Sequence, residues 1–104
     1  MTDLEITKLC ARAMGYEFVE QYGDPRGASI TYLDKSGVKC YYWRPLHDDE
    51  QMAALVKEFR LSVFFDHENG HWCVSLDLTG EDICNADLNR AACMCVAKME
   101  KGKP

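Results

Sequence analysis

The residues most able to do chemistry lie in one short stretch, DHENGHWCVSLD, which runs from Asp66 to Asp77. Within it, His67, His71 and Cys73 have the spacing H-x3-H-x-C. Imidazole and thiolate are ligands that zinc prefers, and a cysteine beside a histidine is also a pairing used in nucleophilic catalysis. The stretch has a third interpretation, because polar residues that end in glycine between two strand-like runs are typical of a hairpin loop.

A metal site would need more ligands than this spacing supplies. Structural zinc takes four protein ligands, and catalytic zinc takes three together with a water molecule. His71 and Cys73 would share one face of a strand, whereas His67 would have to fold over from the loop. Three nearby acids are the candidates for a further ligand: Asp66, Glu68 and Asp77. Because short polar hairpins of this composition are common without a metal, we expect an ordinary loop, with no metal and no cofactor.

A catalytic pair is also disfavoured. Residues two apart on a strand are separated by about 6–7 Å at Cα, which is long for a direct hydrogen bond between His71 and Cys73. The adjacent acids at 48–50 and 81–82 have a structural explanation, because carboxylates are favoured near the positive end of a helix. No residue is therefore assigned a catalytic role, and the sequence predicts a protein that is not an enzyme.

The size and composition are those of one domain. The chain has 104 residues, of which 47% are hydrophobic and 28% charged, so it can bury a core. We predict a single domain over residues 1–104, with residues 98–104 as a frayed tail. No apolar run approaches the ~20 residues that span a bilayer. Acidic residues stand where a signal peptide is basic, so we expect a cytoplasmic protein without a membrane partner.

The net charge argues against nucleic acid as a partner, and the cysteines argue against disulfides and a zinc site. The net charge is −5 and the basic residues are scattered, so direct binding to nucleic acid is not expected. Six cysteines without a secretion signal are expected to be reduced thiols, most of them packed as small apolar side chains. Cys93 and Cys95 would point about 200° apart on a helix, so they could not bind one zinc ion together.

Three helices are predicted from capping residues and apolar spacing. Thr2 has the position of an N-cap and Gly15 follows the first helix, while Asp48 and Asp49 start the second. The third helix is expected to begin at Asn85. Its apolar residues occupy so much of its circumference that we expect it to be covered on more than one side.

Two β-hairpins are predicted between these helices. The runs ASITYLD and VKCYYW flank a turn at residues 35–37, and RLSVFF and HWCVSLD flank DHENG. Residues 16–22 are expected to form a short strand or an irregular crossing, followed by a loop over residues 23–27. Residues 80–82 are expected to form a bend. The predicted fold class is α+β, with one antiparallel sheet of about four strands and three helices in the order α-ββ-α-ββ-α. Residues 40–43 place bulky groups on both faces of one strand, so we expect helices on both sides of the sheet, a three-layer α/β/α sandwich.

Most of the chain resembles the phage ABA sandwich domain family, a group of small tailed-phage and prophage proteins. The resemblance rests on YYWRPLHDDEQMAALVKEF, a hairpin with HWCVSL that carries Trp72, and NADLNRAACMCVAKM with Arg90 near its start. The opening helix, ending ARAMGY, also looks like that of the family, whereas residues 23–27 do not align. The resemblance implies an α/β/α fold and a phage or prophage origin, and it brings no activity, cofactor or catalytic residue.

The aromatic residues give the main indication of function. All five tyrosines and one of the two tryptophans lie within the first 43 residues, and interfaces are enriched in Tyr, Trp and Arg. A small sheet cannot bury all of them, so either some are exposed incidentally or they form a binding surface. The residues expected in such a surface are Tyr22, Arg26, Tyr32, Tyr41, Trp43 and Arg44.

The leading hypothesis is a non-enzymatic phage accessory protein that binds a host protein in the host cytoplasm. Inhibition of a bacterial defence system such as CRISPR-Cas is one form that this activity would take. The alternative is a small-molecule binding protein or enzyme for a nucleotide or signalling metabolite, which would need a pocket with converging Tyr, Arg and His groups. A third hypothesis is a structural homodimer formed through the wide apolar face of the last helix.

Overall fold

The described residues form three helices and six strands. The structure is a computed structural model that describes residues 1–22, 29–76 and 82–103, so the expected loop at 23–27 lies outside the described residues. The elements in chain order are α1 (Asp3–Ala13), β1 (Glu17–Tyr22), β2 (Ser29–Leu33), β3 (Lys39–Trp43), α2 (Asp49–Phe59), β4 (Ser62–Asp66), β5 (His71–Ser75), β6 (Asp82–Asn85) and α3 (Leu88–Lys101). No described helix is long and apolar enough to cross a membrane.

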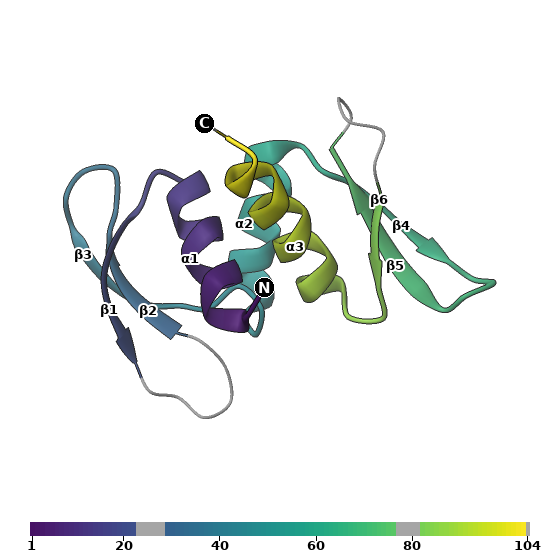
Figure 1. Cartoon of the computed structure of the whole chain (residues 1–104), viewed down its shortest axis with the longest axis horizontal. Coiled ribbons are helices and arrows are strands. Elements are labelled where there is room, and N and C mark those ends of the chain that lie inside the picture. Colours follow the sequence, from purple (N-terminus) through teal and green to yellow (C-terminus); the bar gives the residue numbers. More distant parts are fainter. Residues whose placement is uncertain (23–28, 77–81, 104) are drawn as a thin grey trace.

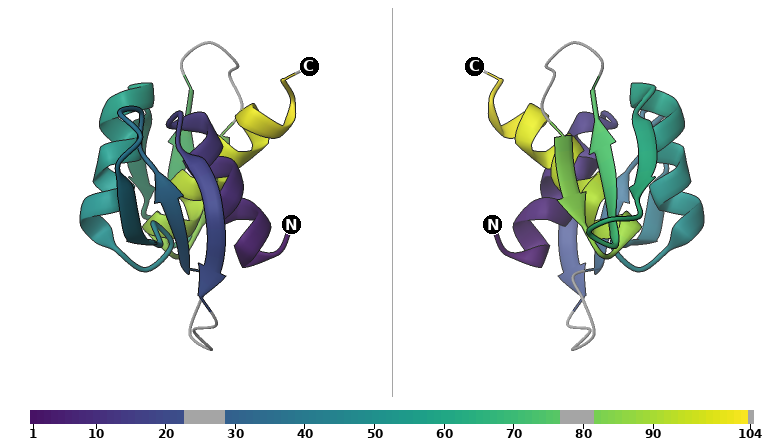
Figure 2. Two further views of the ribbon diagram at one scale, coloured as in Figure 1. Left: turned by 90° about the vertical axis from the view of Figure 1, so that its left-hand side faces the viewer. Right: turned by 90° about the vertical axis from the view of Figure 1, so that its right-hand side faces the viewer.

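The helices form the middle layer of the molecule, and a sheet lies on each side of them (Figure 1). The first sheet has the antiparallel order β1-β2-β3 and the second the order β4-β5-β6. The first sheet packs on α1, the second packs on α3, and α1 packs on α3. Figure 2 shows each sheet from outside, with helices behind it. The α+β class is confirmed, whereas the single four-stranded sheet between helices is wrong.

The additional strands explain why there are two sheets. The uncertain segment after the first helix is β1, which pairs with β2 from Glu17 to Tyr22. A strand that was not predicted, β6, pairs with β5 from Asp82 to Asn85. Each predicted hairpin therefore gains a third strand from its own half of the chain, and α2 carries the chain from one sheet to the other.

The ends of the first two helices follow from their capping residues, as predicted. The Thr2 side chain accepts a hydrogen bond from the backbone N–H of Glu5 at 3.1 Å, and Gly15 follows α1 with a φ of 81°. Asp48 caps α2 by accepting the N–H of Gln51 at 3.0 Å. Local chemistry thus fixes where both helices begin.

The third helix begins later than expected, because Asn85 is the last residue of β6. The N-cap is Asp87, whose side chain accepts the N–H of Asn89 at 2.9 Å, and the Asn85 side chain accepts the N–H of Asp87 at 2.9 Å. The predicted bend at residues 80–82 falls partly on β6, and residues 80 and 81 lie outside the described residues. At its other end α3 continues to Lys101, into the residues expected to fray.

One hydrophobic core joins the three layers. The largest contribution comes from α3, whose buried apolar residues are Ala91, Ala92, Cys93, Cys95, Val96 and Ala97. Contributions from the neighbours include Ile6 and Cys10 of α1, Ile30 of the first sheet and Val74 of the second. The expectation that the last helix is covered on more than one side is confirmed, since α3 contacts α1, α2, β5 and β6. Its apolar face is used within the chain, so the homodimer expected through that face is not supported.

Candidate functional site

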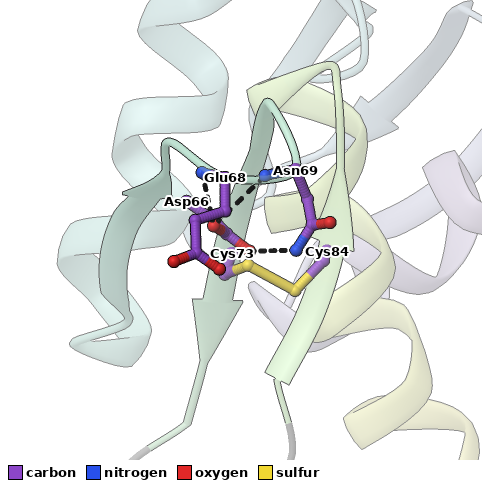
Figure 3. The surroundings of a disulfide bond; sticks show 5 residues. All are labelled: Asp66, Glu68, Asn69, Cys73 and Cys84. Atoms are coloured by element: carbon purple, nitrogen blue, oxygen red, sulfur yellow. Dashed lines mark hydrogen bonds between the residues drawn. A yellow bond between two sulfur atoms is a disulfide. The ribbon is translucent and has the colours of Figure 1, made fainter.

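The stretch with two histidines forms the predicted hairpin turn between β4 and β5. Asp66 holds the turn together, because its Oδ1 accepts the N–H of Glu68 at 3.0 Å and its Oδ2 accepts the side-chain amide of Asn69 at 2.8 Å (Figure 3). The hydrogen bond from the Asn69 side chain is the main reason why the pKa of the Asp66 carboxyl lies below its usual value. Gly70 ends the turn with a φ of 67°, a conformation that glycine adopts without strain.

Cys73 is joined to Cys84 of β6 by a disulfide (Figure 3). The two residues lie opposite each other in the β5–β6 pairing, with their Cα atoms 4.2 Å apart. The expectation of six reduced thiols is therefore wrong for this pair. Sequence patterns did not predict β6, so they did not place Cys84 beside Cys73. In this state the Cys73 sulfur is neither a thiolate ligand nor a nucleophile.

The other candidate ligands of this stretch do not converge. His67 packs its ring against Phe65, with ring centres 4.9 Å apart, and His71 is exposed at the start of β5. Asp77 lies outside the described residues. Within the described ranges, no three histidine, cysteine or acidic side chains lie close enough together to hold a metal ion.

The free cysteines of the helices belong to the core. The Cys10 thiol donates a hydrogen bond to the Cys93 carbonyl at 3.3 Å. This contact with Cys93, together with burial, raises the pKa of Cys10 far above that of a free thiol. Burial likewise raises the pKa of Cys95. A thiol that stays protonated is a poor nucleophile, so the raised pKa values of Cys10 and Cys95 agree with a packing role.

The most distinctive surface lies on β3, where two adjacent tyrosines are both exposed. Tyr41 is 50% exposed and Tyr42 is 56% exposed. Tyr42 has a φ of 64°, in the left-handed region that large side chains rarely adopt. It lies in a break of register, because Trp43 opposes Ile30 while Cys40 opposes Tyr32. The break disturbs the alternation of side chains, so the bulky residues of this strand do not indicate helices on both faces.

Gln51 of α2 holds this irregular backbone in place. Its Nε2 donates to the carbonyl of Tyr42 at 2.9 Å, and its Oε1 accepts the N–H of Arg44 at 2.6 Å. The Arg44 guanidinium lies 5.9 Å from the centre of the Tyr42 ring, and the Lys39 ammonium lies 5.6 Å from that of Tyr41. One amide therefore holds the backbone at Tyr42 and Arg44, beside two exposed rings that each have a cation nearby. We call Tyr41, Tyr42 and Arg44 the tyrosine corner.

The remaining predicted binding residues lie elsewhere. Trp43 is only 2% exposed, and its Nε1 donates to the carbonyl of Thr7 in α1 at 3.1 Å. Tyr32 is half-buried and stacks on Tyr16 with ring centres 4.5 Å apart, and burial raises its pKa to about 12. Tyr22 ends β1. Arg26 lies outside the described residues.

The structure thus brings together Tyr41 and Arg44 of the predicted set and adds Tyr42. The signal for Tyr42 was its place beside Tyr41 in a run of three aromatic residues at 41–43. The irregularity itself depends on Gln51, which lies nine residues further along the chain. No pattern within the strand shows that contact.

No protein-family model, curated protein sequence or solved structure matches this chain. The resemblance to the phage family therefore stays a prediction.

A second candidate site is a hollow of about 380 Å³ between α1 and β1. Its lining includes the aromatic residues Tyr16 and Phe18, the basic residues Lys8 and Arg12, and the acidic residue Glu17. The Lys8 ammonium lies 4.3 Å from the centre of the Phe18 ring. Arg12 is already paired, because its Nε lies 3.0 Å from a carboxylate oxygen of Glu100. Lys8 is therefore the cation that remains for an anionic ligand in this hollow.

Proposed function

We propose that this protein is a non-enzymatic binding protein whose tyrosine corner contacts another protein. The observation that carries the proposal is the conformation of Tyr42, an exposed aromatic residue held in the left-handed region by Gln51. Such backbone strain costs about 1–3 kcal/mol and concentrates at functional sites. A residue that only completed an edge strand would be more stable without it, so we interpret the strain as the cost of displaying the ring.

The chemistry of the corner fits a protein partner. Tyrosine and arginine are enriched among the residues that dominate binding energies. Tyrosine buries a large area with few rotatable bonds, and the planar guanidinium of arginine can bind a carboxylate through two hydrogen bonds. The partner that fits has an apolar pocket for a ring and a carboxylate for Arg44. In the phage setting that the resemblance implies, we propose a host protein in the host cytoplasm, and inhibition of a defence system such as CRISPR-Cas is the specific form to test first.

The test is capture of partners with the chain and with a Tyr41→Ala, Tyr42→Ala double variant. A tyrosine at the centre of an interface contributes about 2 kcal/mol, or about 30-fold in Kd. We therefore expect the double variant to lose any stoichiometric partner that the original chain captures from host lysate. Gln51→Ala should weaken the binding of the same partner less than the double variant does, because both rings remain and only the hydrogen bonds to the backbone are removed.

The matched control is Val38→Ala, which truncates an exposed apolar residue in the turn that precedes β3. This variant should capture the partner as the original chain does, and circular dichroism should show that all variants are folded. Capture that persists in the double tyrosine variant, or that is lost equally with Val38→Ala, would rule out the tyrosine corner as the binding surface.

The hollow between α1 and β1 supports the second candidate, a protein that binds a small anionic molecule. The aromatic rings and Lys8 suit a nucleotide or a similar metabolite, with the base on a ring and the phosphate on the ammonium. Native mass spectrometry of protein purified from its own host cells should then show a bound mass that Lys8→Glu removes. A mass equal to that of the chain alone would count against a small-molecule ligand in this hollow.

A further inference from the structure

Three of the four sheet edges carry features that hinder pairing with another strand. The edge strand β1 has a register break between Phe18 and Glu20. The edge strand β3 has the break at Tyr42, where Gln51 also occupies backbone groups. The edge strand β6 is only four residues long and begins with an aspartate. Bulges, charges and short length are the ways in which proteins protect exposed edges.

The fourth edge strand, β4, is less protected, because its only charged residue is Asp66 at its end, where the hairpin turn begins. It pairs with β5 without a register break and contains no proline, glycine or basic residue. Its three central side chains, Val63, Phe64 and Phe65, are apolar and exposed. A regular, apolar and exposed edge of this kind is a template for pairing with another strand.

The register shows which backbone groups of β4 face outwards. The Cα separation of 4.2 Å between Cys73 and Cys84 is that of a pair without hydrogen bonds between its backbone groups, for which about 4.5 Å is typical. The N–H and C=O of Cys73 therefore point to the other side, towards Phe64, its partner in β4. Because this direction alternates along a strand, the backbone groups of Val63 and Phe65 point away from β5, at the open edge of the sheet.

We propose that β4 pairs antiparallel with β4 of a second copy of this chain, about a two-fold axis at Phe64. In that register Phe64 lies opposite Phe64 of the other copy, and Val63 lies opposite Phe65. Each Val63–Phe65 pair exchanges its outward N–H and C=O groups. The central rings stand at the close spacing of a pair without hydrogen bonds, where aromatic side chains interact most strongly.

The sequence of β4 suits itself as a partner. Read outwards from Phe64 in either direction, it has an apolar residue and then a polar one, so Ser62 lies opposite Asp66 of the other copy. No two like charges meet, and apolar residues meet apolar residues. A two-fold interface requires such a surface, because each copy must supply both halves of it. An unrelated peptide would place no such demand on the order of these side chains.

The dimer is independent of the proposed binding function. The tyrosine corner lies on the first sheet and β4 lies on the second, with the helices between them (Figure 1). Pairing through β4 would therefore leave both tyrosine corners open, one on each copy. A dimeric chain would present its partner with two equivalent surfaces, which raises the apparent affinity for a partner that is itself multivalent.

Sedimentation equilibrium of the chain and of two charged variants tests the proposal. We expect a dimer for the original chain and a monomer for Phe64→Lys and for Phe64→Glu, because each places two like charges opposite each other. An equal mixture of the two variants should recover the dimer. Only an axis at residue 64 places the lysine of one copy against the glutamate of the other. Val38→Lys makes the same change of charge as Phe64→Lys at an exposed apolar residue outside β4 and should leave the dimer intact.

Three results would overturn the proposal. These are a monomeric original chain over the accessible concentration range, a dimer that survives Phe64→Lys, and a mixture no more dimeric than its components. Should the charged variants fail to fold, Phe65→Pro gives a second test. Its missing N–H is one that points out of the sheet, so β4–β5 pairing should survive while the dimer is lost. A folded Phe65→Pro variant that stays dimeric counts equally against the proposal.

Discussion

Replacing Trp43 by alanine is expected to lower the free energy of unfolding by about 3–5 kcal/mol, the usual cost of truncating a buried tryptophan. The side chain is 2% exposed and lies where β3 meets α1. Its ring lies against Tyr16 and Tyr32, with ring centres 5.3 Å and 5.8 Å away, and its N–H binds the carbonyl of Thr7. Alanine would remove these contacts and leave a cavity. Urea unfolding followed by circular dichroism measures the loss.

Two variants separate packing from surface effects. Trp43→Phe keeps an aromatic ring and loses the N–H, so it should cost less than alanine, although it still removes the hydrogen bond to Thr7. Tyr41→Ala changes an exposed residue of the same strand and should stay within about 0.5 kcal/mol of the original chain. If Trp43→Ala were no more destabilising than Tyr41→Ala, Trp43 would not be the link between the first sheet and α1.

The elements that local chemistry determines could be predicted from the sequence. Thr2 and Asp48 cap the helices they were expected to cap, and Gly37 and Gly70 take the positive φ that the two hairpin turns require. These signals act over a few residues. They depend on hydrogen bonds and backbone conformations that do not involve the rest of the chain.

The order of the layers could not be predicted, because two arrangements share one local pattern. The breadth of the apolar surface on α3 indicated burial on several sides, and that was correct. Burial of one helix on several sides is compatible with a helix layer between two sheets and also with a sheet between two helix layers. The choice depends on the third strand of each sheet, and β6, with only four residues from Asp82 to Asn85, resembles a bend before a helix.

Only the excess of aromatic residues in the candidate site could be predicted from the sequence, and not which of them are exposed. The excess of tyrosine near β3 was visible, but Trp43 and Tyr41 are both aromatic residues of one strand, and one is core while the other is surface. What separates them is the register break at Tyr42, and that break is supported by Gln51 of the next helix. The contact between Gln51 of α2 and the backbone of β3 supports the arrangement in which Tyr41 is exposed and Trp43 is buried. Strand propensities carry no information about such a contact.

Removing the Cys73–Cys84 disulfide with a double alanine variant is expected to lower the free energy of unfolding by about 3 kcal/mol. The bond joins residues 11 apart in the sequence, and closing a loop of that size removes conformational entropy from the unfolded chain. Urea unfolding of the double variant should therefore show a lower midpoint. Reductant should shift the original chain in the same direction and leave the variant unchanged.

Counting the free thiols tests whether the disulfide forms, without a measurement of stability. With the chain unfolded and no reductant, alkylation should label only the four free cysteines, Cys10, Cys40, Cys93 and Cys95. Labelling of Cys73 and Cys84 under those conditions would show that the bond does not form. In hydrogen exchange, the double variant should lose protection in β5 and β6 more than in β2, because the bond ties together the two strands that pack on α3. Equal losses in both sheets would mean that the disulfide supports the whole core and that the second sheet has no separate dependence on it.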